Sequence, residues 1–332
     1  MVRRTSSVHG RASIVFEQLA KAASFAPSEE ERTRFFDDEE NPYYKLLDEL
    51  YSEEFALARL RDSADFVVHA EGPAAKGQSP ELRAVNWLCS GVDKQLRALA
   101  AAALSMAGSE AQSLAKKINL RLTGFAPGSL YAGFCVSDAD DGSDSCSIVS
   151  GMTDPAIDAV RKAIRQMSEL PKFVNDEDIS DELSDYINDP AMRDASIVTA
   201  FQLAPTGRIG IHSLEISSGR TPPQTLGQRE RVVLKEAIKS PRMIRSYTGT
   251  FAGTVRGIDL DSKRIHLRGI RDIGTLRCVV RNYDDNLMRG LLDKNLSVTG
   301  RYEVDQNGRP RLMTVESIQI AREQTQTEID PV

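Results

Sequence analysis

The sequence has no long apolar run and no export signal at its start. No stretch approaches the roughly 20 consecutive apolar residues that a helix needs to cross a bilayer. The first ten residues also lack the apolar segment of a secretory signal peptide. We therefore expect a cytoplasmic protein without a membrane partner.

Cysteine and histidine are both scarce, which argues against metal centres and disulfide frameworks. The cysteines include no Cys-x-x-Cys pair, and a cytoplasmic compartment keeps thiols reduced. The four histidines include no His-x-x-x-His pair. We therefore predict no metal ion, no cofactor and four reduced thiols, which are Cys89, Cys135, Cys146 and Cys278.

The motifs of two large enzyme classes are also absent. The sequence contains no Gly-x-Ser-x-Gly elbow and no Gly-x-x-x-x-Gly-Lys-Ser/Thr phosphate loop, which argues against the most familiar hydrolase and NTPase sites. One segment, Gly128-Ser129 followed by Asp138 and Asp140, resembles a nucleotidyltransferase signature, in which a Gly-Ser turn holds a phosphate and two carboxylates hold magnesium. Here the carboxylates belong to an acidic, polar stretch that is typical of a solvated loop. A divergent nucleotidyltransferase is therefore an alternative and not our main prediction.

The composition is that of a globular protein with a substantial core. The chain has 332 residues, of which 41% are apolar and 27% are charged, so we expect about two domains. The N-terminal third has apolar residues at three- and four-residue steps, together with helix start signals at Ser28 and Asn41-Pro42. The strongest pattern predicts a core helix over 80–106.

The middle of the chain predicts a small antiparallel sheet between helices. Two Asp-Pro pairs, at 154–155 and 189–190, begin predicted helices. Alternating segments predict strands over 66–69, 118–123, 130–136 and 208–216. These elements predict an α+β fold for residues 1–217.

The last third of the chain predicts a barrel after a short linker. Pro222-Pro223 interrupts regular structure, so we assign 218–241 to a linker and a connecting helix. The chain that follows alternates like short strands and contains a short helix over 284–292. Strands are predicted over 248–258, 264–268, 275–281, 296–304 and 311–320. We therefore predict a five-stranded barrel over 242–322 and a tail over 323–332.

This order of three strands, a helix and two strands resembles the OB fold, a small five-stranded barrel. Gly249, Gly253 and Gly257 in the first strand fit a barrel strand that bends sharply. The whole layout is similar to that of uncharacterised bacterial proteins that join a helical α+β part to a C-terminal OB-like barrel. The resemblance implies a non-catalytic binding or regulatory protein with a protein partner, such as an accessory or antitoxin-like component of a bacterial toxin-antitoxin or defence locus.

Charge is distributed unequally along the chain. The whole sequence carries 42 Lys and Arg against 48 Asp and Glu, a net charge of −6. Residues 242–320 carry 14 basic and 9 acidic residues, whereas residues 1–241 carry 27 and 36. We therefore expect a basic patch on the barrel, which either binds a separate partner or attracts the acidic part of the same chain.

The basic residues of the barrel follow the alternation of two strands. Arg264, His266 and Arg268 alternate with apolar residues and should share the outward face of one strand. Arg277 and Arg281 do the same on the next strand. Two further basic residues fall in the loops that flank the ligand face of an OB fold. The candidate site for a partner or a nucleic acid is thus Lys263, Arg264, His266, Arg268, Arg277, Arg281 and Arg309.

Aromatic side chains are missing from this predicted face. Single-strand binders usually gain affinity by stacking bases on Phe, Tyr or Trp. The absence of aromatic residues therefore favours a face that is solvated or that docks a protein. Nucleic-acid binding through the barrel is therefore the alternative, and a non-catalytic protein with a protein partner is our prediction.

Overall fold

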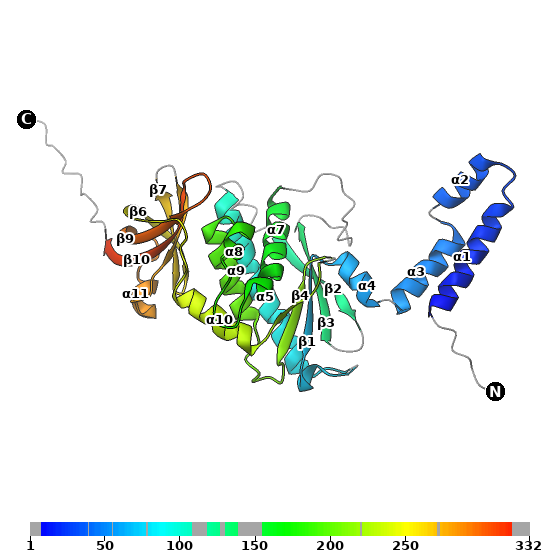
Figure 1. The fold of residues 1–332 in the computed structure, drawn as a ribbon, viewed down its shortest axis with the longest axis horizontal. Helices are drawn as coiled ribbons and strands as arrows, with labels where there is room; N and C mark the ends of the chain where they lie inside the picture. The colour runs from blue at the N-terminus through cyan, green and yellow to red at the C-terminus, as the bar shows by residue number, and fades with distance from the viewer. Residues whose placement is uncertain are drawn as a thin grey trace, which may run out of the picture.

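The computed structural model describes residues 8–38, 40–54, 56–77, 79–107, 118–126, 130–138, 155–219, 221–270 and 273–320. It contains an open five-stranded sheet and a closed five-stranded barrel, together with the helices that pack on and between them (Figure 1). The predicted α+β class is therefore confirmed. No helix in the described ranges is long and apolar enough to cross a membrane.

The N-terminal helices α1 to α3 form an arm that lies beyond α4, at the end of the molecule away from the barrel (Figure 1). Ser28 caps α2, as its spacing from Glu31 predicts, because its hydroxyl accepts a hydrogen bond from the Glu31 backbone N–H at 3.2 Å. Several large apolar side chains of the arm are exposed, among them Phe16 and Phe25. The bounds are α1 Val8–Ser24, α2 Glu29–Asp37, α3 Pro42–Glu54 and α4 Ala56–Ser63.

The open sheet has the strand order β2-β3-β1-β4-β5, and all of its neighbouring strands are antiparallel. One face, which includes Phe66 and Val68, packs in the main core with α5, α7 and α9. The opposite face packs in part on α4 through Leu60 and Val67. The predicted hairpin is confirmed as β2 and β3. The bounds are β1 Phe66–Glu71, β2 Ile118–Ala126, β3 Leu130–Asp138, β4 Ser213–Ser217, β5 Gln224–Leu226, η1 Pro73–Ala75, α5 Leu82–Ala107, α7 Pro155–Glu169, η2 Leu170–Phe173, α8 Glu182–Tyr186 and α9 Pro190–Leu203.

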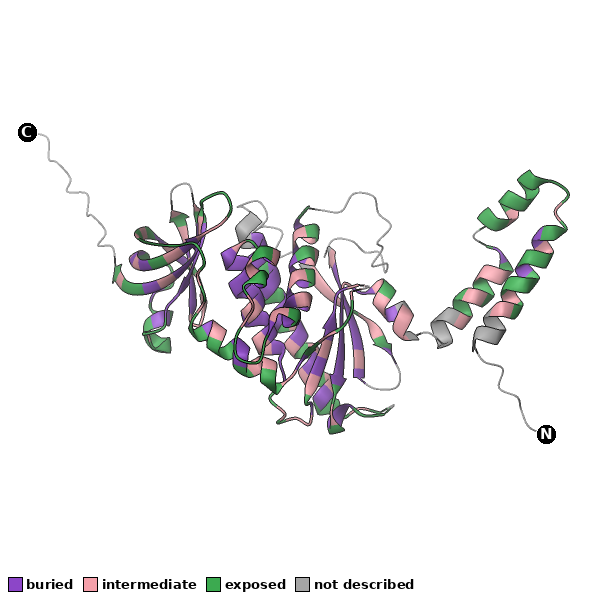
Figure 2. Cartoon of the chain, viewed as in Figure 1, coloured by how far each residue is buried: buried purple, intermediate pink, exposed green. Residues whose placement is uncertain are grey.

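Helix α9 is buried along most of its length, because it lies between the open sheet and the barrel (Figure 2). It contacts α5, α7 and α10 (Gln228–Lys239), and also the barrel strand β10 (Pro310–Ile320). The predicted start signal is confirmed, since the Asp189 carboxylate accepts hydrogen bonds from the backbone N–H groups of Ala191 and Met192 at 2.8 and 3.1 Å. This helix therefore joins the two parts of the molecule.

The segment 218–241, which we predicted as a linker and a connecting helix, contains that helix and contributes buried residues to the first core. Strand β5 extends the open sheet by pairing with β4. Helix α10 (Gln228–Lys239) buries Val233 and Leu234 in the same core as the sheet. Strand β5 and helix α10 thus pack with the open sheet. Pro222-Pro223 correctly indicates a break between β4 and β5. Strand β5 itself was not predicted, because three residues are too few to show an alternating pattern.

The barrel closes in the order β10-β8-β7-β6-β9. Strands β8 and β10 are parallel, and the other neighbours are antiparallel. Its core is separate from that of the open sheet and includes Val255, Leu267, Leu276 and Met313. The five predicted strands and the predicted helix all appear, in the predicted order. The bounds are β6 Ser246–Asp259, β7 Arg264–Ile270, β8 Gly274–Val279, α11 Asp285–Arg289, β9 Asn295–Val304 and β10 Pro310–Ile320.

The cysteines differ from the prediction at one position. Cys89 and Cys278 are free thiols, as expected. Cys135, on β3, is disulfide-bonded, so the prediction that it is reduced was wrong. Residue spacing could not reveal this bond, because disulfide formation depends on the distance between Cα atoms in the fold. Cys146 lies outside the described residues.

Candidate functional site

Asp194 on α9 lies at the centre of a buried ion-pair cluster with Arg264 of β7 and Arg277 of β8. Its Oδ1 is 2.7 Å from Nη2 of Arg264, and its Oδ2 is 2.6 Å from Nε of Arg277. The side chains of Asp194 and Arg264 are only 3% and 1% exposed. Burial by itself raises the pKa of Asp194, but the two guanidinium groups outweigh it and hold that pKa well below its usual value. The carboxylate is therefore ionised and fixes the barrel to α9.

Two further ion pairs join the same parts of the molecule. Nη2 of Arg193, also on α9, donates to both carboxylate oxygens of Glu303 on β9, at 2.8 and 2.7 Å, and both side chains are buried. Nε of Arg311 on β10 donates to Oδ2 of Asp189 at 2.8 Å. Helix α9 and its N-cap contribute both acidic and basic side chains, and so does the barrel. The contact is therefore an interface within one chain in which opposite charges are paired.

The predicted basic face is divided by this interface. Arg264 and Arg277 point outward from the barrel, as the alternation predicts, and they are buried against α9, so this part of the predicted face is covered by the same chain. His266 is partly buried beside Arg277, with its Nε2 at 3.2 Å from Nη1 of that arginine. The alternation of residues along a strand predicts which side chains point away from the barrel core. It does not predict whether another element of the fold covers those side chains.

The other predicted residues lie outside the Asp194 cluster. Lys263 pairs with Asp285, and its Nζ also donates to the carbonyl of Tyr283 at 3.3 Å. Arg268 is partly buried. Arg281 and Arg309 are exposed and take no part in the Asp194 cluster. The sequence feature that indicated this internal interface was the opposite net charge of residues 1–241 and residues 242–320.

The pKa of His266 predicts a dependence of stability on pH. Burial, followed by the positive charges of Arg277 and Arg268, lowers the pKa of His266 from 6.5 to about 3. Below pH 6.5 the unfolded chain therefore binds a proton that the folded chain does not. We expect the unfolding free energy to fall between pH 6.5 and pH 4.5, with His266 contributing up to about 1.4 kcal/mol per pH unit.

Urea unfolding of the wild type and of His266→Gln across this pH range measures that contribution. The wild type should lose more stability than the variant as the pH falls. His212→Gln is the matched control, because His212 is exposed, and it should follow the wild-type curve. Parallel curves for the wild type and His266→Gln would show that His266 carries no such shift.

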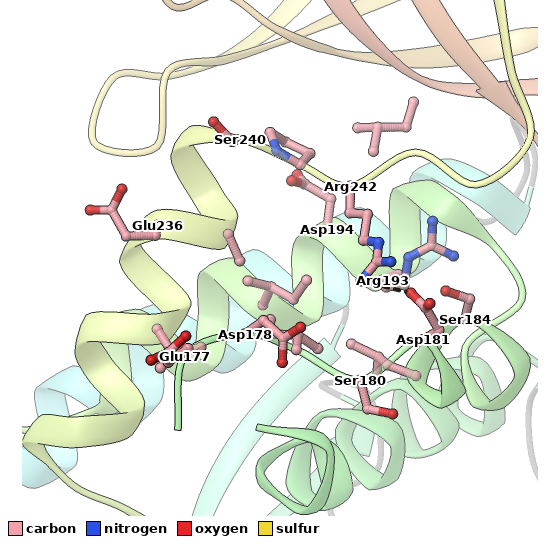
Figure 3. Close-up of a pocket in the computed structure, with 17 residues that line it drawn as sticks. Glu177, Asp178, Ser180, Asp181, Ser184, Arg193, Asp194, Glu236, Ser240 and Arg242 are labelled. Atoms are coloured by element: carbon pink, nitrogen blue, oxygen red, sulfur yellow. Dashed lines mark ion pairs between the residues drawn. The ribbon is translucent and has the colours of Figure 1, made fainter. Parts of the chain in front are cut away.

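A cleft of about 260 Å³ lies next to the Asp194 cluster, between α9, α10 and the segment that leads into α8 (Figure 3). We call it the junction cleft. Its apolar wall includes Ile179, Leu183, Ile197 and Val233. The polar residues that line it are Glu177, Asp178, Ser180, Asp181, Ser184, Arg193, Asp194, Glu236, Ser240 and Arg242.

The rim of the junction cleft is predominantly acidic. The exposed carboxylates among its lining residues are those of Glu177, Asp178, Asp181 and Glu236, and the one exposed guanidinium among them is that of Arg242. Arg242 pairs with Asp181 at 3.0 Å and Lys239 pairs with Glu236 at 2.7 Å, so the negative charge left for a ligand is that of Glu177 and Asp178. Apolar walls under an acidic rim suit a ligand that is apolar in part and positively charged.

A larger cavity, of about 610 Å³, lies between α5, α9 and the turn from β6 to β7. His266, Arg268 and Arg277 line it, so it contains three residues of the predicted face. Other charges in its wall are already neutralised, since Lys94 pairs with Asp261 at 3.4 Å and Arg256 pairs with Asp293 at 2.8 Å. The junction cleft differs from this cavity in that two of its exposed carboxylates, those of Glu177 and Asp178, belong to no ion pair among the described residues.

The nucleotidyltransferase alternative cannot be followed in the described part of the chain. Gly128, Ser129 and Asp140 lie outside the described residues, and Asp138 is the last residue of β3. Comparison of the sequence with protein-family models finds no match, and comparison with curated proteins finds none either.

Proposed function

We propose that this protein is a non-catalytic binding protein and that its junction cleft receives a segment of a partner protein. The observation that carries the proposal is the combination of an apolar wall with an acidic rim in one cleft beside a fixed interface. A cleft of about 260 Å³ is near the lower end of the usual range for ligand sites, so it suits one or two side chains of a peptide. The partner segment should pair Lys or Arg with an aliphatic or aromatic residue.

We also propose that the barrel is OB-like and acts as a structural half of the molecule. Its first strand, β6, lies between the second and the fourth, and its third strand is parallel to its fifth. The ligand face of an OB fold includes the second and third strands. Here Arg264 and Arg277 of those strands form ion pairs with Asp194, which favours a protein partner over direct nucleic-acid binding by this face.

An accessory or antitoxin-like role in a bacterial locus stays a prediction from the layout of the chain.

Selection from a random peptide library on the full-length protein tests the proposed ligand chemistry. Peptides that combine basic and apolar residues should be enriched, and their affinity should fall with salt because the rim is exposed and acidic. Ala237→Trp, which fills the cleft, and Glu177→Lys, which reverses one rim charge, should each weaken binding about tenfold, or about 1.4 kcal/mol.

Glu182→Lys is the matched control, because Glu182 is exposed on α8 but does not line the cleft. It should leave the affinity unchanged, and circular dichroism should show that all three variants are folded. Enrichment of acidic peptides, or equal affinities for Ala237→Trp and the wild type, would place the binding surface elsewhere.

A further inference from the structure

The face of the open sheet opposite to α5, α7 and α9 carries a second group of functional side chains. Alternate residues of β1 point to opposite faces, so His69 and Glu71 share a face with Val67, which packs toward α4. The antiparallel register places Glu215 of β4 beside His69. Residues 146 positions apart in the sequence thus meet on neighbouring strands.

The donor atoms of His69, Glu71 and Glu215 converge on one point. One ligand atom from each residue lies within 4.8 Å of the other two, and Nδ1 of His69 is 2.9 Å from Oε2 of Glu215. The His69 side chain is only 10% exposed, whereas Glu71 is exposed. The group therefore has one buried member, His69, and one member, Glu71, that is open to solvent.

Neighbouring side chains hold two of these groups in place. The ring of Tyr131 on β3 stacks on the His69 imidazole, with centroids 3.8 Å apart and an angle of 6° between the planes. The Ser213 hydroxyl donates a hydrogen bond to Oε2 of Glu71 at 3.1 Å. Supporting contacts of this kind orient metal ligands in known sites.

We propose that His69, Glu71 and Glu215 bind one divalent first-row transition-metal ion, of which zinc is the best representative. Zinc binds imidazole nitrogen and carboxylate oxygen at about 2.0–2.2 Å, so tetrahedral ligand atoms lie roughly 3.3 Å apart. The separation of His69 Nδ1 from Glu215 Oε2, 2.9 Å, is close to that value, and no pair of the three ligand atoms is more than 4.8 Å apart, so small side-chain rotations would complete the site. An imidazole ligand favours zinc, iron or copper over magnesium and calcium.

Water is expected to complete the coordination on the exposed side of Glu71. Nδ1 of His69 must carry no proton when it binds the ion, so its hydrogen bond with Glu215 is replaced by a bond from each group to the metal. This site is distinct from the junction cleft. It also differs from the sequence prediction of no metal, which relied on His-x-x-x-His spacing within one segment.

Isothermal titration of zinc into chelator-treated full-length protein tests the proposal. We expect one ion per chain, a rise in Tm with zinc by mass action, and no such rise with magnesium at the same concentration. Glu71→Gln and Glu215→Gln should each weaken zinc binding at least about tenfold, and His69→Gln should abolish the one-to-one binding.

Glu71→Gln is the decisive variant, because Glu71 is exposed and its substitution leaves the buried sheet contacts intact. His212→Gln is the control, since His212 is an exposed histidine outside the cluster, and it should bind zinc like the wild type. Absence of binding at about 100 µM free zinc, unchanged affinity in Glu71→Gln, or an equal loss in His212→Gln would overturn the assignment.

Discussion

Replacing Asp194 by alanine should lower the unfolding free energy by about 3–5 kcal/mol. The change leaves the guanidinium groups of Arg264 and Arg277 buried against α9 without a counter-charge. An uncompensated buried charge costs far more than the loss of an exposed ion pair. Urea unfolding followed by circular dichroism should show a transition at clearly lower denaturant than in the wild type.

Asp176→Ala provides the matched control for this prediction. Asp176 pairs with Arg229 at 2.8 Å, but the two side chains are 85% and 59% exposed. Removal of an exposed pair should cost less than about 1 kcal/mol. Equal losses in the two variants would mean that burial of the Asp194 cluster does not determine its contribution.

Replacing Gly300 by alanine should destabilise the barrel by about 3 kcal/mol. Gly300 lies on β9, opposite Gly249 of β6 and Val315 of β10. A Cβ at this position would lie 2.1 Å from the Thr314 carbonyl oxygen and 3.0 Å from the Glu316 nitrogen, both of which are backbone atoms. The strands would have to separate, and overpacking of this kind costs about 1–3 kcal/mol or more. Hydrogen exchange should accelerate in β9 and β10.

Gly91→Ala makes the same chemical change where the structure has room for it. Gly91 lies within α5, and a Cβ there would meet no atom within 4 Å beyond the helix backbone nearby. Alanine is the better helix former, so this variant should gain about 0.5–1 kcal/mol. If Gly300→Ala lowered the unfolding free energy no more than Gly91→Ala does, that result would contradict the close approach of β9 and β10.

The sequence predicted the elements of the fold better than their packing. Alternation and turn residues are local signals, so the strands of the barrel and the hairpin of β2 and β3 were identified in the predicted order. Edge strand β5 was missed because three residues carry no usable period. The disulfide at Cys135 was missed because it depends on distance in the folded chain.

The candidate sites depend on contacts between distant segments, which local patterns do not encode. The strand period correctly placed Arg264 and Arg277 on the outside of the barrel, but only the fold shows that α9 covers them. The opposite charges of the two parts of the chain were the one sequence signal for that contact. His69 and Glu215 meet through strand register alone, over a separation of 146 residues.

A double-mutant cycle between Asp194 and Arg264 tests most directly whether the basic face of the barrel is an internal interface. The unfolding free energies of the wild type, Asp194→Ala, Arg264→Ala and the double variant are needed. Asp194→Ala leaves the guanidinium groups of both Arg264 and Arg277 without a counter-charge, whereas the double variant leaves only that of Arg277. The double variant should therefore lose at least about 1 kcal/mol less than the sum of the single losses. Losses that add to within about 0.5 kcal/mol would show that the two residues do not interact and would contradict the docking of the barrel on α9.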